Sequence, residues 1–137
     1  MSYAMAAALQ AAIYQKLLAD PVVGSFVGSA IYDAAPAGER PETYVSLGPE
    51  EVRDRSDTSG HGADHRFTVS VVTDAAGFGA AKSAAGAICD ALQDADLALA
   101  RGRLVGLWFD RATARRSGKA GRARRIDLRF RARVEDN

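Results

Sequence analysis

The sequence contains only one cysteine and two histidines among its 137 residues. A lone cysteine excludes an intramolecular disulfide, and Cys89 lies among small apolar residues, which favours a buried helical side chain over a nucleophile. No apolar run approaches the roughly 20 residues that a membrane-spanning helix needs. The N-terminal segment lacks the basic region of a signal peptide, and Gln10, Gln15 and Lys16 interrupt its apolar block. These absences predict a globular protein with no membrane partner.

The two histidines are the only candidates for a metal site. His61 and His65 are four residues apart, which on a helix would place both imidazoles on one side of a metal. However, Gly60 and Gly62 disfavour a helix, and no glutamate follows His61 as it does in the H-E-x-x-H motif. We therefore interpret both as solvated loop histidines, and we expect no metal and no cofactor.

Catalytic constellations are lacking as well. No Ser-His-Asp, Cys-His or paired-carboxylate pattern is present, so we expect no catalytic residue and no enzyme activity. The turn TDAAGFGAAKSAAG follows a strand pattern and begins a helix, as phosphate-binding loops do. Its spacing fits neither phosphate-binding motif, because Ala81 precedes Lys82 and Lys82 stands where a third glycine would be.

Charge is abundant and unevenly distributed, although the net charge is only +1. Residues 1–98 contain 6 basic and 13 acidic side chains, whereas residues 99–137 contain 12 basic and 4 acidic ones. Such asymmetry marks either a nucleic-acid surface or two complementary parts of one subunit or of neighbouring subunits. An arginine-rich hairpin near the C-terminus accounts for most of the basic excess.

Hydrophobic periodicity predicts one domain over residues 1–137 with an α+β fold. Met5, Leu9, Ile13 and Leu17 recur every four residues, which predicts a helix that starts at an N-cap Ser2 and ends at Asp20-Pro21, before a loop. A second helix is expected at residues 75–95, and strands at residues 30–33, 43–47, 66–73, 104–116 and 122–134. We expect a mainly antiparallel sheet of four to five strands with two helices packed on one face.

The last two strands carry the clearest side-chain patterns. In the final strand, apolar residues from Ile126 to Val134 alternate with charged ones that include Arg129 and Arg131. Simple alternation in the strand before it would place Leu107 and Phe109 on one side and Leu104 and Trp108 on the other. One of these bulky sets is expected to be exposed in the monomer and covered in an assembly.

The order of motifs along the chain resembles a known family. LLADPVV, VGSAIYDAAP and PETYVSLG are followed by a charged segment, then by HRFTVSVVTDAAGFGAAKSAAGAICDAL and a hairpin that ends in RRIDLRFRARVED. This order is similar to that of the tail terminator, or tail completion, proteins of long-tailed phages, and above all to the tail terminator of bacterial gene transfer agents. The resemblance covers nearly the whole chain.

The resemblance implies a structural role without catalysis or cofactor. It implies a homo-hexameric ring that caps the tail tube, stops its polymerisation and joins the tail to the head. The implied partners are the major tail tube protein, a head-side connector or stopper protein, and DNA that passes through the channel without sequence-specific binding. The implied location is the bacterial cytoplasm during assembly and then the neck or tail region of the released particle.

Gly48 to Arg66 is the most highly charged segment, with eight charged residues and both histidines. We interpret it as a docking arm that becomes ordered against a neighbour, the alternative being a solvated surface loop. The alternative function is a small nucleic-acid-binding module that uses the arginine-rich C-terminal hairpin. The predicted subunit or partner contacts are Arg53, Asp54, Arg55, Asp57, Trp108, Arg129 and Arg131.

Overall fold

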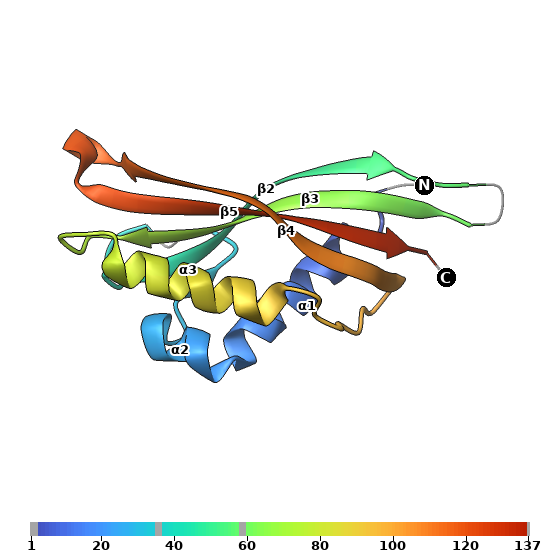
Figure 1. Ribbon diagram of the computed structural model, residues 1–137, viewed down its shortest axis with the longest axis horizontal. Helices are drawn as coiled ribbons and strands as arrows, with labels where there is room; N and C mark the ends of the chain where they lie inside the picture. The colour runs from blue at the N-terminus through green and yellow to red at the C-terminus, as the bar shows by residue number, and fades with distance from the viewer. Residues whose placement is uncertain (1–2, 35–36, 58–59, 137) are drawn as a thin grey trace.

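The computed structural model describes residues 3–34, 37–57 and 60–136, and it has two layers (Figure 1). A long twisted sheet forms one layer, and three helices cover the middle of one of its faces. The helices are α1 (Ala6–Ala19), α2 (Pro21–Val27) and α3 (Gly79–Leu92). The strands are β1 (Ile31–Tyr32), β2 (Thr43–Asp54), β3 (Gly62–Thr73), β4 (Arg103–Ser117) and β5 (Ala123–Glu135), with a short 3-10 turn η1 (Lys119–Gly121) between the last two. None of the helices in the described ranges is long and apolar enough to cross a membrane.

The strand order is β1-β2-β3-β5-β4, and every neighbouring pair is antiparallel except β1 with β2. This confirms the predicted α+β fold with a mainly antiparallel sheet. β1 pairs with β2 only at Val45 and Ser46, so in the described part of the chain the outer edge of β2 has no strand neighbour beyond that point. β4 forms the opposite edge along its full length. The sheet therefore has two edges with unpaired backbone groups.

The core lies between the sheet and the helices, where the apolar sides of β3 and β5 face α1 and α3. The Phe130 ring, which is fully buried, stacks on Phe67 with 5.6 Å between centroids and meets the edge of Phe109 at 5.8 Å. Buried alanines, among them Ala81 and Ala84, line the side of α3 that faces the sheet. Their small side chains allow the close helix–sheet packing that the alanine-rich pattern predicts.

A helix occupies the place of the loop that was expected after Asp20. The Asp20 carboxylate accepts hydrogen bonds from the backbone N–H groups of Val22 and Val23, at 2.9 and 3.0 Å, and Pro21 is the first residue of α2. Proline suits this position because a helix needs no N–H donor from its first residue. The Asp-Pro pair therefore ends α1 and also begins α2, and the prediction of two helices was wrong.

The beginning of α1 also differs from the expected one. Ser2, the predicted N-cap, lies outside the described residues, and α1 has Met5 at its N-cap position, with no side-chain hydrogen bond. Met5 is instead fully buried in the core. Packing of the apolar stripe, and not a capping side chain, stabilises this end of the helix.

β2 and β3 are longer than predicted, because most of the segment from Gly48 to Arg66 is strand. A bulge between Leu47 and Glu50 carries β2 past Pro49 to Asp54. Proline in a sheet is confined to edges and bulges, and both conditions hold here. The bulge also changes the register, so that Glu50 lies opposite Phe67 on the helix side of the sheet.

Two bulges in β4 overturn the expected distribution of its bulky side chains. The first lies between Leu104 and Gly106, and it places Leu104 opposite Val134 on the helix side together with Leu107 and Phe109. Trp108 is therefore alone on the other side, opposite Arg131. Leu107 is fully buried, whereas the Phe109 side chain remains 42% exposed.

The cap of α2 gives a first prediction. Asp20→Ala should lower the free energy of unfolding by about 1 kcal/mol, because two N–H groups lose their acceptor. Asp33→Ala is the matched control, since Asp33 is an exposed aspartate that caps no helix. Urea unfolding followed by circular dichroism measures both variants. Equal stability of the two variants would contradict the assigned cap.

Candidate interaction surfaces

The side of the sheet away from the helices is uncovered and strongly charged (Figure 1). Cross-strand register places nine arginines and four carboxylates on this side. We call it the arginine face, and its charged residues are Arg53, Arg66, Arg103, Arg111, Arg115, Arg125, Arg129, Arg131 and Arg133, with Glu51, Asp64, Asp127 and Glu135. Positive charge therefore exceeds negative charge on this face.

Two carboxylates, Glu51 and Asp64, hold part of this arginine array in place. Glu51 accepts a hydrogen bond from Arg53 Nε at 3.1 Å and lies 3.8 Å from Arg129 Nη2. The hydrogen bond from Arg53 is the main reason why the pKa of Glu51 is lowered. Asp64 joins Arg55 at 3.0 Å and lies 3.9 Å from Arg133. These pairs connect β2, β3 and β5 across the face.

Trp108 lies flat on the arginine face in a small stack. A Cβ atom at Gly106 would come within 2.2 Å of the Trp108 indole, so only glycine fits beneath the ring. The Arg131 guanidinium lies over the indole, 4.7 Å from its centre. This cation–π contact orients both predicted contact residues toward the same surface.

A hollow of about 310 Å³ lies near the centre of the arginine face. Four arginines surround it, while the short side chains of Pro49, Thr68 and Thr113 keep it open. A second hollow of about 170 Å³ shares Pro49, Thr68 and Arg129 with the first and extends to Glu51 and Arg66. The arginines of the first hollow are Arg111, Arg115, Arg125 and Arg129.

The end of the β2–β3 hairpin carries the other predicted contacts. Arg55 N–H donates to the Gly62 carbonyl at 2.7 Å, and Asp57 N–H donates to the Gly60 carbonyl at 3.0 Å. The Arg133 guanidinium donates to the Arg55 carbonyl at 2.8 Å. Hydrogen bonds from Ser56 lower the pKa of Asp54. The segment is thus a hairpin, and its ordering against a partner remains a prediction.

The two histidines have different environments. His61 is exposed, as expected, but His65 is fully buried on the helix side of the sheet, so its interpretation as a solvated residue was wrong. Its Nδ1 lies 3.4 Å from Glu50 Oε2, and Glu50 Oε1 accepts a hydrogen bond from the Tyr3 hydroxyl, which raises the pKa of Tyr3. No group of three or more His, Cys, Asp or Glu side chains gathers for a metal within the described ranges.

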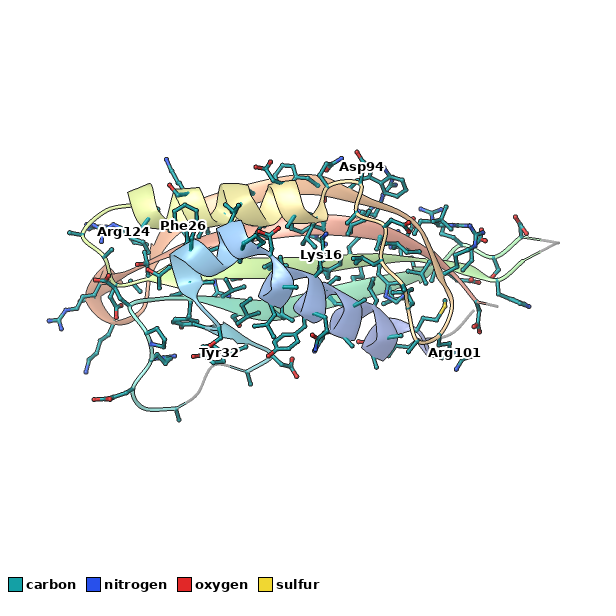
Figure 2. All side chains as sticks on the ribbon, turned by 90° about the horizontal axis from the view of Figure 1, so that it is seen from below. Lys16, Phe26, Tyr32, Asp94, Arg101 and Arg124 are labelled. Atoms are coloured by element: carbon teal, nitrogen blue, oxygen red, sulfur yellow. The ribbon has the colours of Figure 1, made fainter. Side chains whose placement is uncertain are left out.

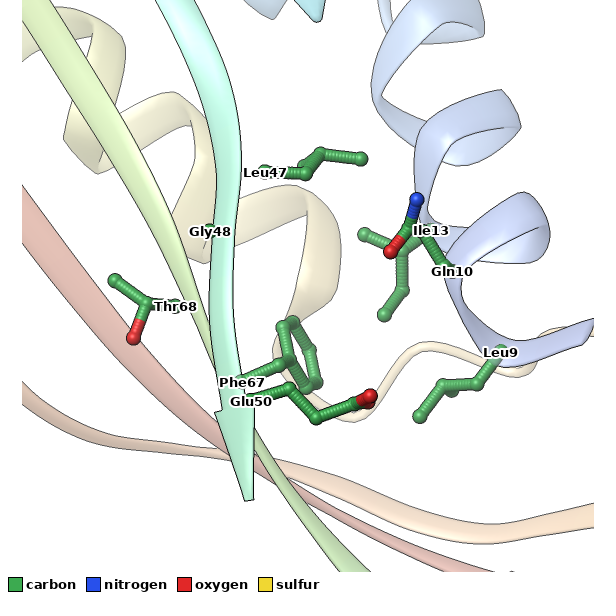
Figure 3. A pocket seen from close by; sticks show the side chains of 8 residues that line it. All are labelled: Leu9, Gln10, Ile13, Leu47, Gly48, Glu50, Phe67 and Thr68. Atoms are coloured by element: carbon green, nitrogen blue, oxygen red, sulfur yellow. The ribbon is translucent and has the colours of Figure 1, made fainter. Parts of the chain in front are cut away.

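Glu50 also lines a small cavity between α1 and the sheet, shown in Figure 3. Leu9, Ile13, Leu47 and Phe67 form most of its wall. Its volume of about 20 Å³ is enough for one water molecule and for nothing larger. The cavity is therefore no candidate for a substrate or cofactor site.

An apolar groove runs beside the free edge of β4. It has a volume of about 280 Å³ and lies between α3 and the helix side of β4. Burial raises the pKa of the Cys89 thiol in this groove, which opposes formation of a nucleophilic thiolate. The groove is lined by Lys82, Ala85, Gly86, Cys89, Phe109, Ala112, Ala114, Ile126 and Leu128.

The sheet brings together four of the seven predicted contact residues. Arg53, Trp108, Arg129 and Arg131 share the arginine face, whereas Asp54, Arg55 and Asp57 lie at the end of the hairpin. Sequence reasoning missed the arginines of the neighbouring strands and the bridging carboxylate. The bulges that place Glu51 and Arg111 on this face leave no clear mark in the sequence, whereas Arg66 follows the regular alternation of β3. The missed residues are Arg66, Arg111 and Glu51.

Charge is segregated by layer and not only by position along the chain. The helices and their connecting loops contain eight carboxylates and four basic side chains. Figure 2 views this helix layer from below, with Lys16 and Asp94 on its surface. The carboxylates are Asp20, Asp33, Glu39, Glu42, Asp74, Asp90, Asp94 and Asp96, and the basic residues are Lys16, Arg40, Lys82 and Arg101.

Asp127 gives a prediction for the electrostatics of the arginine face. Partial burial opposes its ionisation, but hydrogen bonds from Ser70 Oγ at 2.6 Å and Arg125 Nε at 2.8 Å outweigh this and lower its pKa. A lowered pKa stabilises the fold above the unfolded-state value of about 3.9, and the effect is lost as the pH falls through the folded-state pKa.

Asp127→Asn should therefore cost about 1 kcal/mol at pH 7 and progressively less as the pH falls below about 4. Asp110→Asn is the control, because Asp110 is exposed and has no ion pair within the described residues. Urea unfolding at pH 7 and at pH 3 measures the difference. A loss of stability that does not change with pH would contradict the assignment.

Comparisons with known proteins agree with this picture of surfaces without a catalytic centre. No curated protein matches the sequence. A chain in a structure described as the virion of a native gene transfer agent particle is 64% identical, with a TM-score of 0.92, and the match covers 98% of this chain and 99% of that one. The family model for tail completion protein gp17 matches residues 11–135. The chain therefore belongs to the tail completion protein gp17 family and is a structural protein, not an enzyme.

Proposed function

We propose that this chain is the tail terminator of a phage-like particle of the gene transfer agent type. Six copies form a ring that caps the tail tube, stops its polymerisation and joins the tail to the head-side connector, with a central channel for DNA. The observation that carries this proposal is the 64% identity, over nearly the full length, to a chain of a gene transfer agent virion. Assembly takes place in the bacterial cytoplasm, and the ring then lies in the neck of the released particle.

A closed ring needs two different complementary patches on each subunit, because its interface joins head to tail. The apolar groove beside β4 is one candidate patch, and the half-exposed Phe109 at its border enlarges it. Apolar side chains are also exposed on α1 and α2, where Leu18, Val22 and Phe26 are 37%, 55% and 43% exposed. We propose that this α1–α2 surface of one copy covers the groove of the next.

The ends of the sheet supply surfaces for other partners. The β2–β3 and β4–β5 hairpins project beyond the helix layer at opposite ends of the molecule (Figure 1). The β2–β3 end carries Arg53, Asp54, Arg55 and Asp57, so it presents both signs of charge in a defined hairpin. We propose that it docks on a neighbouring subunit, the tube protein or the connector.

Electron microscopy of the purified protein, with and without the tail tube protein, tests the ring. We expect rings in at least one of the two samples, and Ala112→Glu should abolish them because it places a charge in the apolar groove. Thr113→Glu is the matched control, since Thr113 is the next residue of β4 but lies on the arginine face. If neither wild-type sample contains rings, the proposed ring is wrong. If the Ala112→Glu variant still forms rings, the apolar groove is not part of the subunit interface.

Shortening the β2–β3 hairpin tests the docking arm separately. Replacing residues 55–62 by Asn-Gly should keep Asp54 paired with Ala63, since this dipeptide favours a two-residue hairpin turn. The variant should unfold within a few degrees of the wild type yet yield at least tenfold fewer joined particles in an assembly reaction. A variant that joins tails and heads normally would rule out the arm.

A further inference from the structure

We propose that the hollow in the arginine face binds phosphate groups of double-stranded DNA, so that this face is the side of the subunit that looks into the channel. The position of the DNA rests on the proposed function. The binding itself is a property of the folded chain and is testable without a ring. The charge around the hollow, its lining and the arrangement of its hydrogen-bond donors favour DNA phosphates as the ligand.

The charge balance around the hollow favours a polyanion. Asp127 is its single carboxylate, and it is already engaged by Arg125 at 2.8 Å and Arg115 at 3.6 Å. Arg111, on the opposite rim, forms no ion pair within the described residues. The ion pair between Arg129 and Glu51 is a long one, with 3.8 Å between nitrogen and oxygen. Guanidinium groups present two parallel donors that match phosphate oxygens. The hollow therefore holds more donors than its own carboxylate can satisfy.

Arg66 adds an independent observation in the adjoining hollow. Its Nε atom is buried and has no hydrogen-bond partner among the described residues. Buried donors are nearly always paired in folded proteins, so an unpaired one indicates a missing acceptor. The atom is closed to solvent, so an oxygen of a neighbouring phosphate on the same DNA strand would reach it once the Arg66 side chain turns outward into the hollow that shares Pro49, Thr68 and Arg129 with the first.

The lining also indicates which part of the nucleic acid is contacted. No aromatic side chain lines either hollow, and the one tryptophan of the face is already covered by Arg131. Stacking of unpaired bases, the usual basis of single-strand binding, therefore has no platform here. Contacts to phosphates carry no sequence information, so binding should be independent of sequence.

The other side of the molecule would repel DNA, because carboxylates outnumber basic groups two to one on the helix layer. A subunit of this kind approaches a polyanion with its arginine face first. The same polarity leaves the helix layer free to face away from the channel. Charge thus orients the subunit in the ring without any base-specific contact.

Fluorescence anisotropy with a 20-bp duplex at 50–300 mM salt tests this inference. The wild type should bind duplexes of different sequence equally, with an affinity that falls steeply as salt rises. Replacing Arg111, Arg115 and Arg129 together by alanine should lower the slope of log affinity against log salt by up to about 0.9 for each arginine. The triple lysine variant at these positions should recover most of the slope.

A control variant with the same change in net charge shows whether a loss of DNA binding comes from the hollow or from the overall charge of the protein. Replacing Lys16, Arg40 and Arg101 by alanine removes three positive charges from the helix layer and should leave DNA binding within about twofold of the wild type. Equal losses of DNA affinity in the two alanine variants would overturn the site. The same holds if the wild-type protein does not bind DNA at 50 mM salt. Equally tight binding of poly-glutamate would assign the face to an acidic protein instead.

Electron microscopy of the same variants separates this inference from the proposed function. If the arginine variants form rings but no longer bind DNA, the result supports both the ring and the phosphate site. If the wild type binds DNA through the hollow but forms no ring, the ring fails and the phosphate site remains. If rings form and DNA binding is absent from the wild type, only the phosphate site is wrong.

Discussion

The strict alternation of side chains along β5 is the constraint on which the rest of the structure depends. β5 is paired on both sides, with β3 and with β4, so its two-residue period is imposed on the whole sheet. Phe130 and its apolar neighbours build the core beneath the helices, and the arginines between them point the other way. A slip of one residue would bury guanidinium groups and expose Phe130, at a cost far greater than the stability of a small domain.

This alternation also explains why the molecule acts through surfaces. The helix side is filled by close-packed apolar side chains, and the described residues enclose there a cavity of about 20 Å³ beside Glu50, besides the open apolar groove at β4. His65 is fully buried in that packed layer, and its ion-pair partner there is the half-buried Glu50. Chemistry that needs an enclosed pocket has no place in such a layer. Recognition is left to the arginine face, the sheet edges and the projecting hairpins.

The strands and helices that follow a regular hydrophobic period could be predicted from the sequence. The features that depend on bulges, which interrupt this period, could not. Strong alternation identified β5 with its two faces, and the four-residue spacing identified α1. The bulges at Pro49 and Val105 were not predictable, because each needs a free edge or a neighbour such as the Trp108 indole to become favourable. For the same reason the sequence could not place Arg111 and Glu51 on one surface. Asp20-Pro21 signals both the end of one helix and the start of another, and only the packing of α2 on α3 decides between these readings.

The proposed ring around DNA would place three demands on a subunit, and the two-layer fold separates them in space. Subunits must adhere to one another, and the apolar groove and the α1–α2 surface lie at the level of the helix layer. The ring must contact proteins above and below, and the hairpins project at opposite ends of the sheet. DNA must pass without being read, and the arginine face has donors for phosphate but no free aromatic ring in its hollows. Because β5 fixes the faces while bulges and turns tune the edges and ends, each surface can change without disturbing the other two.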